Sequence, residues 1–432
     1  MTHPIRLGAQ RRVAVIGGGI SGMGVAHRLA GSAQVTLVEA APRLGGHART
    51  VTAGINGTQA VDTGFIVFNR VNYPNLTALF ARLGVPVAKS KMTFAASVDG
   101  GRIEYALDTL NSLFGQRRNA LRPGFARMLR DIMRFNAQGE NLAANDPAMT
   151  IGDLIARLGA SDAFRDHYLL PFSGAIWSTP TEDILRFPAD ALMRFFRNHA
   201  LLGVSGQHQW YTVQGGSIEY VTRLSAALRA MSVDIRTAAP VQAVQRTPLG
   251  VEIKLSGSGW ERFDEVVFAT HSDDALRLLA DPAPEEAAAL GDILYQPNSA
   301  VLHADPALMP RRRRCWASWN YVEPVERRAA GIGLTYWMNS LQPIPESDPL
   351  FVTLNSTQAI RDELIYDETI FSHPLYTADA IRAQDAIRGF NGARNTWFCG
   401  AWMKNGFHED GLSSGLDVAE AILERPVAGI AA

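Results

Sequence analysis

Three ionisable residues that could move a proton, His408, Glu409 and Asp410, stand together near the end of the chain in the sequence GFHEDGLSSG. An imidazole exchanges a proton near neutral pH, and a neighbouring carboxylate can act as an acid or a base. Acids at the start of a helix are also ordinary caps, and a glycine-led helix start favours bound negative charge. The stretch therefore predicts either a proton-transfer site at these three residues or the support of a cofactor.

A glycine pattern near the other end of the chain predicts a nucleotide site. Apolar residues at positions 13–16 and 35–38 are typical of buried parallel strands, and a helical apolar pattern starts at residue 20 between them. The turn before that helix, GGGISG, has the spacing GxGxxG. Its glycines permit a tight turn, close approach of a pyrophosphate and close packing of helix on strand. The expected cofactor-binding residues of this turn are Gly17, Gly19, Ile20, Ser21 and Gly22.

The residues after the second predicted strand point to the kind of dinucleotide. Glu39 ends that strand, where an acid would hydrogen-bond a ribose hydroxyl. In the following sequence, APRLGGHART, the glycine pair Gly45 and Gly46 lies between Arg43 and Arg49. Glycines let the backbone approach a cofactor, and the guanidinium fork suits phosphate oxygens. This arrangement predicts a second cofactor-binding loop.

The two motifs together resemble the flavin amine oxidase and phytoene desaturase superfamily, in which the second motif holds the FAD diphosphate and ribityl chain. The resemblance implies FAD rather than NAD. It extends to VDTG at 61–64, to VQGGS at 213–217 before an apolar helix, and to DEVVFAT at 264–270. It implies that Gly64 lies beside the flavin and that Val241 starts a strand at the adenine end.

The sequence WFCGA at 397–401 is a short apolar strand that ends at a glycine, and Gly411 is expected to open a helix after it. In the superfamily this strand and helix cradle the isoalloxazine, which implies that Gly400, Ala401, Gly411 and Leu412 contact the cofactor. The GFHEDGLSSG stretch is then first a cofactor cradle. Phe407 falls where monoamine oxidases carry a cage tyrosine, and this difference weakens an amine oxidase function.

The resemblance implies an α/β and α+β fold of the amine oxidase type. A discontinuous Rossmann-type FAD-binding domain is expected from residues 1–75, 213–275 and 391–432, because these blocks must meet in space. A mixed-sheet and helical substrate domain is expected from residues 76–212 and 276–390.

Composition limits the partners and the compartment. The chain has 432 residues and a net charge of -1, so no overall field draws in nucleic acid, and no nucleic-acid partner is expected. Cys315 and Cys399 show no disulfide framework and no metal spacing, so a reducing compartment and no metal are expected. The start of the chain, MTHPIRLGAQRR, has no apolar signal core, and no apolar run is long enough to cross a bilayer. A cytoplasmic protein is expected.

Two basic segments could contact a membrane. Apolar residues recur at helical spacing from Phe125 to Met133 with arginines off the stripe, after Arg117, Arg118 and Arg122. Such a helix would either lie on an anionic membrane or pack on the protein core. Residues 311–314 are four arginines near Trp316 and Trp319, which predicts a phosphate site or a solvated loop. Nine aromatic residues could line an apolar tunnel or belong to the core: Phe172, Trp177, Phe187, Phe195, Phe196, Trp210, Tyr211, Tyr336 and Trp337.

A finer resemblance rests on NRVNYPNLTALFARLGV at 69–85, on Ile176-Trp177-Ser178 and on GFHEDGL. These segments are similar to a bacterial subgroup associated with cyclopropane-fatty-acid-synthase-like methyltransferases and with fatty-acyl desaturases of the furan fatty acid route. The resemblance implies a peripheral protein on the inner face of the membrane that takes a phospholipid or fatty-acyl substrate, with a lipid methyltransferase as a partner.

The leading hypothesis is therefore an FAD-dependent oxidoreductase that desaturates an unsaturated fatty-acyl chain of membrane phospholipid by hydride transfer to flavin N5. A nearby base or water would take the proton, and oxygen or another acceptor would reoxidise the flavin. One alternative is an amine oxidase of polyamines or aromatic amines. Another is a flavin-binding membrane adaptor for a lipid methyltransferase.

Overall fold

The computed structural model describes residues 10–146, 148–177, 184–198, 201–203, 207–323, 333–356 and 358–425. Residues 1–9 and 426–432 of the predicted FAD-binding domain lie outside the described residues, and so does Ser178.

A five-stranded parallel sheet gathers strands from distant parts of the chain. Its order is β10-β2-β1-β14-β20, and every neighbouring pair is parallel. The strands are β1 (Arg12–Ile16), β2 (Gln34–Val38), β10 (Asp234–Arg236), β14 (Glu265–Phe268) and β20 (Thr396–Phe398). The expected strands near residues 13–16, 35–38, 264–270 and 397–401 thus meet in one sheet, which confirms the Rossmann-type fold. The predicted domain boundaries themselves stay a prediction.

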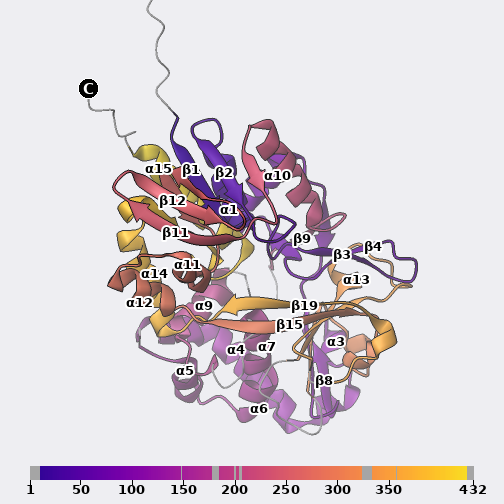
Figure 1. Ribbon diagram of the computed structural model, residues 1–432. Helices are drawn as coiled ribbons and strands as arrows, with labels where there is room; N and C mark the ends of the chain where they lie inside the picture. Colours follow the sequence, from indigo (N-terminus) through magenta and orange to yellow (C-terminus); the bar gives the residue numbers. More distant parts are fainter. Residues whose placement is uncertain are drawn as a thin grey trace, which may run out of the picture.

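Helices cover one face of this sheet. Val13 and Val15 of β1 pack with α1 (Ile20–Leu29) and α15 (His408–Glu424), and α10 (Ile218–Ala230) and α2 (Pro74–Leu83) join the same apolar cluster. In Figure 1, α15 lies beside β1 at the upper end of the molecule. The predicted helix after residue 411 is confirmed, but it starts at His408, so Gly411 lies within its first turn rather than at its start.

A smaller antiparallel sheet covers the opposite face. Ala14 and Ile16 pack with β11 (Val241–Thr247), β12 (Gly250–Leu255) and β13 (Trp260–Phe263). The same cluster includes residues of α11 (Ser272–Leu278), α12 (Pro284–Gly291) and α14 (Ala378–Phe390). Alternate residues of β1 therefore serve two separate cores, as expected for a central parallel strand.

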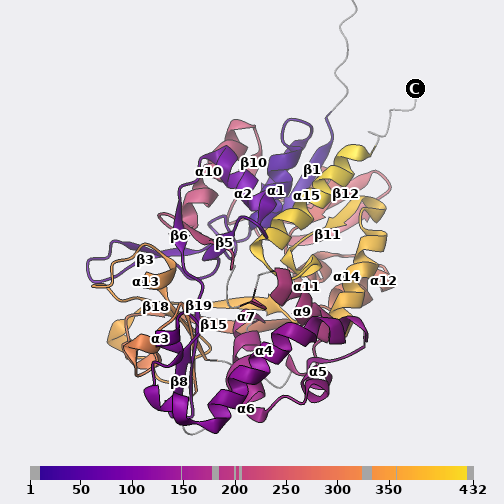
Figure 2. The ribbon, with the colours of Figure 1, turned by 180° about the vertical axis from the view of Figure 1, so that it is seen from behind.

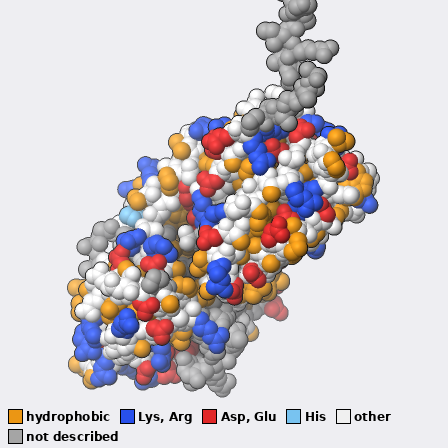
Figure 3. Space-filling model, turned by 90° about the vertical axis from the view of Figure 1, so that its left-hand side faces the viewer, with side chains coloured by type: hydrophobic (Ala, Val, Ile, Leu, Met, Phe, Trp, Pro, Cys, Tyr) orange, Lys and Arg blue, Asp and Glu red, His pale blue; other side chains and the backbone are white. Residues whose placement is uncertain are grey.

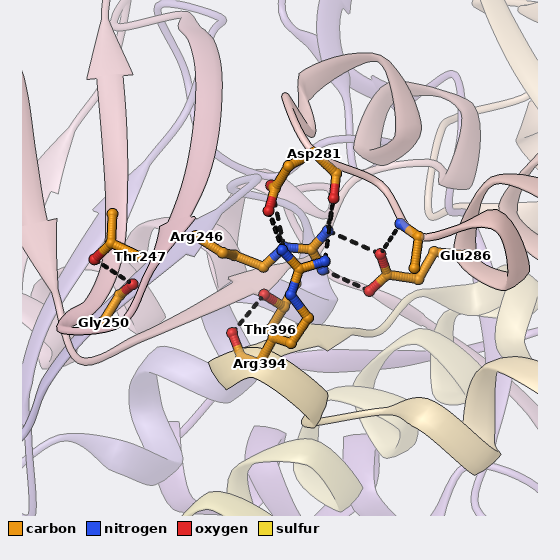
Figure 4. Close-up of polar contacts among 8 residues, drawn as sticks. Arg246, Thr247, Gly250, Asp281, Glu286, Arg394 and Thr396 are labelled. Carbon is orange, nitrogen blue, oxygen red and sulfur yellow. Dashed lines mark hydrogen bonds and ion pairs between the residues drawn. The ribbon is translucent and has the colours of Figure 1, made fainter.

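A buried ion cluster ties this outer layer to the central sheet (Figure 4). Arg246 of β11 donates to both carboxylate oxygens of Glu286 on α12, at 2.5 and 2.8 Å, and pairs with Asp281 at 3.2 Å. Asp281 also pairs with Arg394, which lies just before β20. The side chains of Arg246 and Glu286 are only 2% and 4% exposed, so this pair depends on its full set of partners.

The second part of the fold is built on a seven-stranded mixed sheet of order β19-β15-β18-β17-β16-β7-β8. Its strands are β7 (Phe94–Val98), β8 (Ile103–Ala106), β15 (Tyr295–His303), β16 (Trp319–Val322), β17 (Leu334–Trp337), β18 (Phe351–Leu354) and β19 (Ile365–Pro374). Its helices include α3 (Leu110–Leu113), α4 (Pro123–Ala144), α5 (Ile151–Leu158), α6 (Asp162–Phe164), α7 (Leu170–Trp177), α9 (Ala189–Asn198) and α13 (Met338–Leu341). In Figures 1 and 2, β15 and β19 cross the middle of the molecule, and α4, α5 and α6 lie below them.

Two small sheets lie between these parts. One pairs β3 (Thr50–Ala53) with β4 (Gln59–Asp62), which ends at the predicted VDTG segment. The other joins β5 (Val67–Asn69), β9 (Trp210–Val213) and β6 (Val87–Ser90), and so draws strands from both predicted domains.

The amphipathic helix α4 packs on the core of its own domain. Phe125 is 3% exposed and Met128 is fully buried, whereas only Met133 of the predicted apolar stripe is widely exposed, at 62%. The prediction that this stripe faces a membrane is therefore wrong, and its alternative, packing on the protein core, is confirmed. No helix among the described residues is long and apolar enough to span a bilayer. In Figure 3, acidic, basic and hydrophobic side chains are interspersed, as the net charge suggests.

Candidate active site

One cavity of about 1110 Å³ runs from the carboxyl ends of the parallel strands into the second part of the fold. Most of the predicted cofactor residues line it: Gly17, Gly19, Ile20, Ser21, Glu39, Gly45, Gly46, Gly64, Val241, Gly400 and Ala401. These residues come from six separate segments, so the fold brings them together. Ligands of parallel α/β sheets bind at this edge.

The glycine-rich turn has the shape that a pyrophosphate needs. Gly17 has a φ of +108°, and a Cβ there would lie 2.7 Å from the Ala269 carbonyl oxygen. A Cβ on Gly22 would lie 1.9 Å from the Gly17 carbonyl oxygen, so only glycine lets α1 approach the turn. A Cβ on Gly19 would meet no atom within 4 Å, because Gly19 faces the cavity. No side chain caps α1, so its first N–H groups are available to a bound phosphate.

Glu39 is held at the end of β2 by backbone donors. Its carboxylate accepts hydrogen bonds from the N–H groups of Gly18, at 2.6 Å, and Ala41, at 2.8 Å. Each carboxylate oxygen keeps further acceptor capacity, and the residue lines the cavity. This geometry fits the predicted contact with a ribose hydroxyl.

The two predicted phosphate-binding arginines are used otherwise. Arg43 donates to the carbonyl oxygens of Gly46 and Ala48, at 3.0 and 3.1 Å, and thereby braces the glycine-pair loop. Arg49 forms a bidentate ion pair with Asp367 of β19, in which Nη1 and Nη2 donate to the two carboxylate oxygens at 2.5 and 2.8 Å. Neither arginine lines the cavity. Both guanidiniums thus bond protein oxygens that support the loop, and their predicted contact with phosphate stays a prediction.

Gly22, Gly411 and Leu412 lie behind the cavity wall rather than in it. A Cβ on Gly411 would lie 2.9 Å from the Ser21 hydroxyl, and Leu412 fills the space over Gly24 of α1. These residues let α15 pack closely on α1. They thereby help to place α1 and residues 400–401, and their own contact with the cofactor stays a prediction.

His408 lines the cavity and is held on two sides. Its ring stacks on Phe65, with centroids 3.9 Å apart, and its Nε2 lies 2.7 Å from the Tyr220 hydroxyl. Burial raises the pKa of Tyr220 well above its usual value, so that hydroxyl is protonated and donates to Nε2. Burial, with a contribution from His47, lowers the pKa of His408 to about 3. His408 is therefore neutral at pH 7 and carries its proton on Nδ1.

Glu409 and Asp410 point away from the cavity. The Glu409 carboxylate accepts from the backbone N–H groups of Asn75 and Leu76, at 3.0 and 2.9 Å, and so caps α2. Asp410 accepts from the Phe407 N–H at 3.0 Å, at the start of its own helix. Neither residue lines the cavity. A catalytic role for these acids has no geometric support, and the capping alternative accounts for both.

Sequence reasoning did not identify three further histidines in the cavity wall, His47, His271 and His373. His47 lies 5.8 Å from His271 and 5.7 Å from His373, measured between ring centroids. Burial lowers the pKa of His47 to about 3 and that of His373 to about 4, with neighbouring histidines adding to each effect. These rings are neutral at pH 7. The only sequence signal was His47 itself, which directly follows the glycine pair.

A relay of hydrogen bonds fixes the proton of His373. The Ser299 N–H donates to Asn355 Oδ1 at 3.0 Å, so the Asn355 amide nitrogen must donate to Asn298 Oδ1, 2.6 Å away. Asn298 Nδ2 then donates to His373 Nδ1 at 2.8 Å. An amide nitrogen only donates, so Nδ1 is unprotonated and the proton of His373 is on Nε2. His373 thus presents an N–H donor at the cavity wall.

The far limb of the cavity is apolar. Four of the nine aromatic residues considered for a tunnel line it, which confirms that prediction for Phe172, Phe195, Trp210 and Tyr336. Phe187 and Phe196 belong to the core, Tyr211 and Trp337 do not line the cavity, and the Trp177 side chain is not among the described parts. Aliphatic residues continue the limb to its mouth: Leu107, Leu110, Leu113 and Ile132. Among the described lining residues, the carboxylates lie at the nucleotide end and the mouth: Glu39, Asp108 and Asp274.

Fold and cavity together define a dinucleotide-dependent oxidoreductase. The sequence profile described as flavin containing amine oxidoreductase matches residues 20–306, and the chain belongs to that family. FAD is accordingly its cofactor. The open Gly19 position, the uncapped start of α1 and the placement of Glu39 fit FAD, so these residues would hold its diphosphate and ribose.

Solved structures share the fold at low sequence identity. A putrescine oxidase bound to putrescine has a TM-score of 0.68 and 15% identity, with 96% of this chain and 99% of that one covered. A CLA-producing fatty acid isomerase from P. acnes has a TM-score of 0.65 and 15% identity, covering 95% and 98%. Cyclohexylamine oxidase from Brevibacterium oxydans has a TM-score of 0.67 and 16% identity, covering 96% and 100%. No curated protein matches the chain in sequence.

Proposed function

We propose that this flavoenzyme desaturates an unsaturated fatty-acyl chain of a membrane phospholipid. The observation that carries the proposal is the long apolar limb of the cavity, lined by aromatic and aliphatic residues from Phe172 to its mouth at Leu110. Such a limb stabilises an extended hydrocarbon chain, and among the described residues it offers a charged amine no carboxylate partner beyond Asp108 at its mouth. The fold is shared with a fatty acid isomerase as well as with amine oxidases.

Bound FAD supplies a hydride acceptor at N5, and oxygen restores its oxidised form. The substrate carbon chain loses one hydride and one proton, which leaves a new double bond. The chain's own contribution is to place one carbon of the acyl group and to exclude bulk water. The apolar walls do both, because they hold the hydrocarbon along the limb.

The proton goes to water rather than to an acid of the GFHEDGL segment. Glu409 and Asp410 lie outside the cavity. The Nε2 atom of His408 already accepts a hydrogen bond from the Tyr220 hydroxyl, so it is not available to the substrate. In His373, Nε2 carries the ring proton and Nδ1 accepts a hydrogen bond from Asn298, so neither nitrogen is free to take a proton from the substrate. His47 and His373 instead offer neutral polar groups at the cavity wall.

Turnover with defined lipids tests the proposal. The purified yellow protein is incubated in air with phospholipid vesicles whose chains are monounsaturated, and the released fatty acids are analysed by mass. The expected product has lost two hydrogens and forms with consumption of oxygen. Oxidation of a polyamine or an aromatic amine instead would establish the amine oxidase, and inactivity toward lipids and amines alike would favour the membrane adaptor.

Partner and location follow as further parts of the proposal. An enzyme that acts on chains within a bilayer would work on the inner membrane face, beside the methyltransferase that modifies the same lipids. Recovery of a lipid methyltransferase with the tagged protein after mild crosslinking would support this part. Absence of the tagged protein from the membrane fraction of cells would contradict the proposed location.

A further inference from the structure

The segment of residues 107–122, between β8 and α4, carries its apolar and polar residues in inverted positions. Gln116 and Asn119 are 2% and 1% exposed, whereas Leu121 is 86% exposed and Leu110 is 77% exposed. Folded chains ordinarily bury leucine and expose amides. Two widely exposed leucines and two buried amides thus lie within one short segment.

Buried amides fix the segment on the sheet. Gln116 accepts from the Glu104 N–H at 3.2 Å and donates to the Gly101 carbonyl oxygen at 3.2 Å. Asn119 donates to the Glu104 carbonyl oxygen at 2.9 Å. These bonds hold the turn of residues 117–121 on β8 and direct Leu121 outward. The exposed leucine is thus a fixed feature of the fold.

Two arginines beside Leu121 converge on one backbone oxygen. Arg118 Nη2 donates to the Arg102 carbonyl oxygen at 3.4 Å, and Arg122 Nη1 donates to the same oxygen. Arg122 Nη1 is also held by the side-chain oxygen of Asn119, at 3.1 Å. Neither guanidinium forms an ion pair with a carboxylate among the described residues, and each keeps unspent donors.

Two further guanidiniums, of Arg102 and Arg312, crowd the same place. The pKa of Arg122 is lowered by partial burial and by Arg118, Arg102 and Arg312. Asp99 pairs with Arg102, and the buried Glu104 carboxylate pairs with Arg312, so the positive charges of Arg118 and Arg122 remain uncompensated. The structure therefore joins the two basic segments of the sequence in one surface.

This surface adjoins the mouth of the apolar limb. Leu110 is exposed and also lines the cavity, together with Asp108, Leu113 and Ile132. A reciprocal cap between Thr109 and Ser112 fixes the start of α3 at that point. In Figures 1 and 2, α3 and β8 lie at the end of the molecule opposite β1 and α15.

We propose that residues 107–122 form a docking surface for an anionic phospholipid bilayer. Arg118 and Arg122 bind lipid phosphates while Leu110 and Leu121 enter the acyl region, and the cavity mouth then opens onto the lipid chains. Guanidinium donors and exposed leucines together match this partner, since phosphate and hydrocarbon lie next to each other only at a lipid surface. Binding to the bilayer does not depend on the proposed function. Only the entry of an acyl chain into the cavity rests on it.

Vesicle flotation of the FAD-loaded full chain tests the surface without turnover. The protein is mixed with vesicles of phosphatidylcholine alone, or with equal parts of phosphatidylglycerol, at low and high salt. It should float with the anionic vesicles, and more at low salt. Arg118→Ser/Arg122→Ser should weaken binding by roughly thirtyfold, because each arginine contributes about a fivefold factor at such a surface. Leu121→Ser should weaken it by about tenfold.

Matched variants of other exposed residues are the controls. Leu249→Ser replaces a leucine that is 67% exposed on the β11–β12 hairpin, and Arg82→Ser/Arg229→Ser replaces two surface arginines. These should float like the wild type, with FAD content and melting temperature verified for every variant. Flotation that is absent, or equal in all variants, overturns the docking surface even if lipid turnover is found. Capture of an acidic carrier protein in place of vesicles overturns it as well.

Discussion

His408 illustrates how a residue of the right type can be tied to another task. Its ring lies between Phe65 and the Tyr220 hydroxyl, and its low pKa leaves it a weak base at pH 7. We expect His408→Gln to slow FAD reduction by less than about tenfold, whereas loss of a general base costs a hundredfold or more. Stopped-flow reduction of the FAD-loaded variant measures this. A hundredfold fall with FAD retained would restore the base role.

The Asn298 relay makes a prediction about a single proton. In Asn298→Leu the His373 Nδ1 loses its donor, so the ring should exchange between its two neutral forms instead of holding the proton on Nε2. Nitrogen NMR of histidine-labelled protein distinguishes the two forms. Asn355→Asp, which keeps the Ser299 contact but cannot donate to Asn298, should have the same effect. A fixed Nε2–H in both variants would refute the relay.

At the scale of elements, Glu409 joins two helices. Its carboxylate on α15 caps α2, whose own preceding residue, Tyr73, gives no side-chain cap. In Glu409→Gln, one of the two carboxylate oxygens that accept from the backbone N–H groups of α2 is replaced by an NH₂ donor. The free energy of unfolding should therefore fall by ~1–2 kcal/mol. The reduction rate of FAD should stay within a few fold of wild type. A large rate loss at unchanged stability would make Glu409 catalytic.

The ion cluster of Figure 4 joins β11, α12 and the start of β20. Glu286→Gln leaves the buried Arg246 without its main partner and should lower the free energy of unfolding by ~3 kcal/mol. Asp379→Asn, which breaks an ion pair that is 64% and 71% exposed, should change it by less than ~1 kcal/mol. Urea unfolding of both variants checks the contrast. Equal effects would contradict the role assigned to burial.

At the scale of the molecule, buried neutral histidines should make stability fall on acidification. The pKa values of His47 and His408 are lowered to about 3, and those of His303 and His373 to about 4, mainly by burial. The unfolded chain takes up these protons near its ordinary pKa, so from pH 7 to about 5.5 each group costs ~1.2 kcal/mol. Burial raises the pKa values of Asp62 and Asp410 to about 6, so both take up protons in the folded state over this range. Each therefore raises the free energy of unfolding by ~0.8 kcal/mol.

The effect of the four histidines is larger than that of the two aspartates. Between pH 7 and about 5.5, the free energy of unfolding should therefore fall by ~3 kcal/mol. Denaturant unfolding at the two pH values measures it. His303 lies away from the cavity and donates from Nε2 to Thr353, since Asp305 N–H occupies Nδ1. His303→Gln keeps a donor without titrating, so it should reduce the pH dependence by ~1 kcal/mol. Stability that rises toward pH 5.5 would contradict the account.

Local patterns predicted the nucleotide half of the site well. The turn from Gly17 to Gly22, the acid at Glu39 and the strand start at Val241 were found because each depends on neighbouring residues. The ion pair of Arg49 could not be predicted, because its partner, Asp367, is distant in sequence and meets it only in the fold. His373 was missed for the same reason, since Asn298 reaches it across the β15–β19 pair.

Periodicity likewise predicted helix α4 but not its surroundings. A regular apolar stripe shows that one face is covered, and it cannot distinguish protein from lipid. The exposed residues that break such a pattern, Leu110 and Leu121, carry more information about a partner. They became visible only when burial was known.

We propose above that a lipid acyl chain delivers a hydride to the bound FAD. The direct test is anaerobic mixing of the FAD-loaded protein with vesicles of monounsaturated phospholipid while the flavin absorbance is followed. We expect bleaching, with loss of two hydrogens from one acyl chain for each FAD reduced. Flavin that stays oxidised with these lipids, yet bleaches with a polyamine or an aromatic amine, would contradict it.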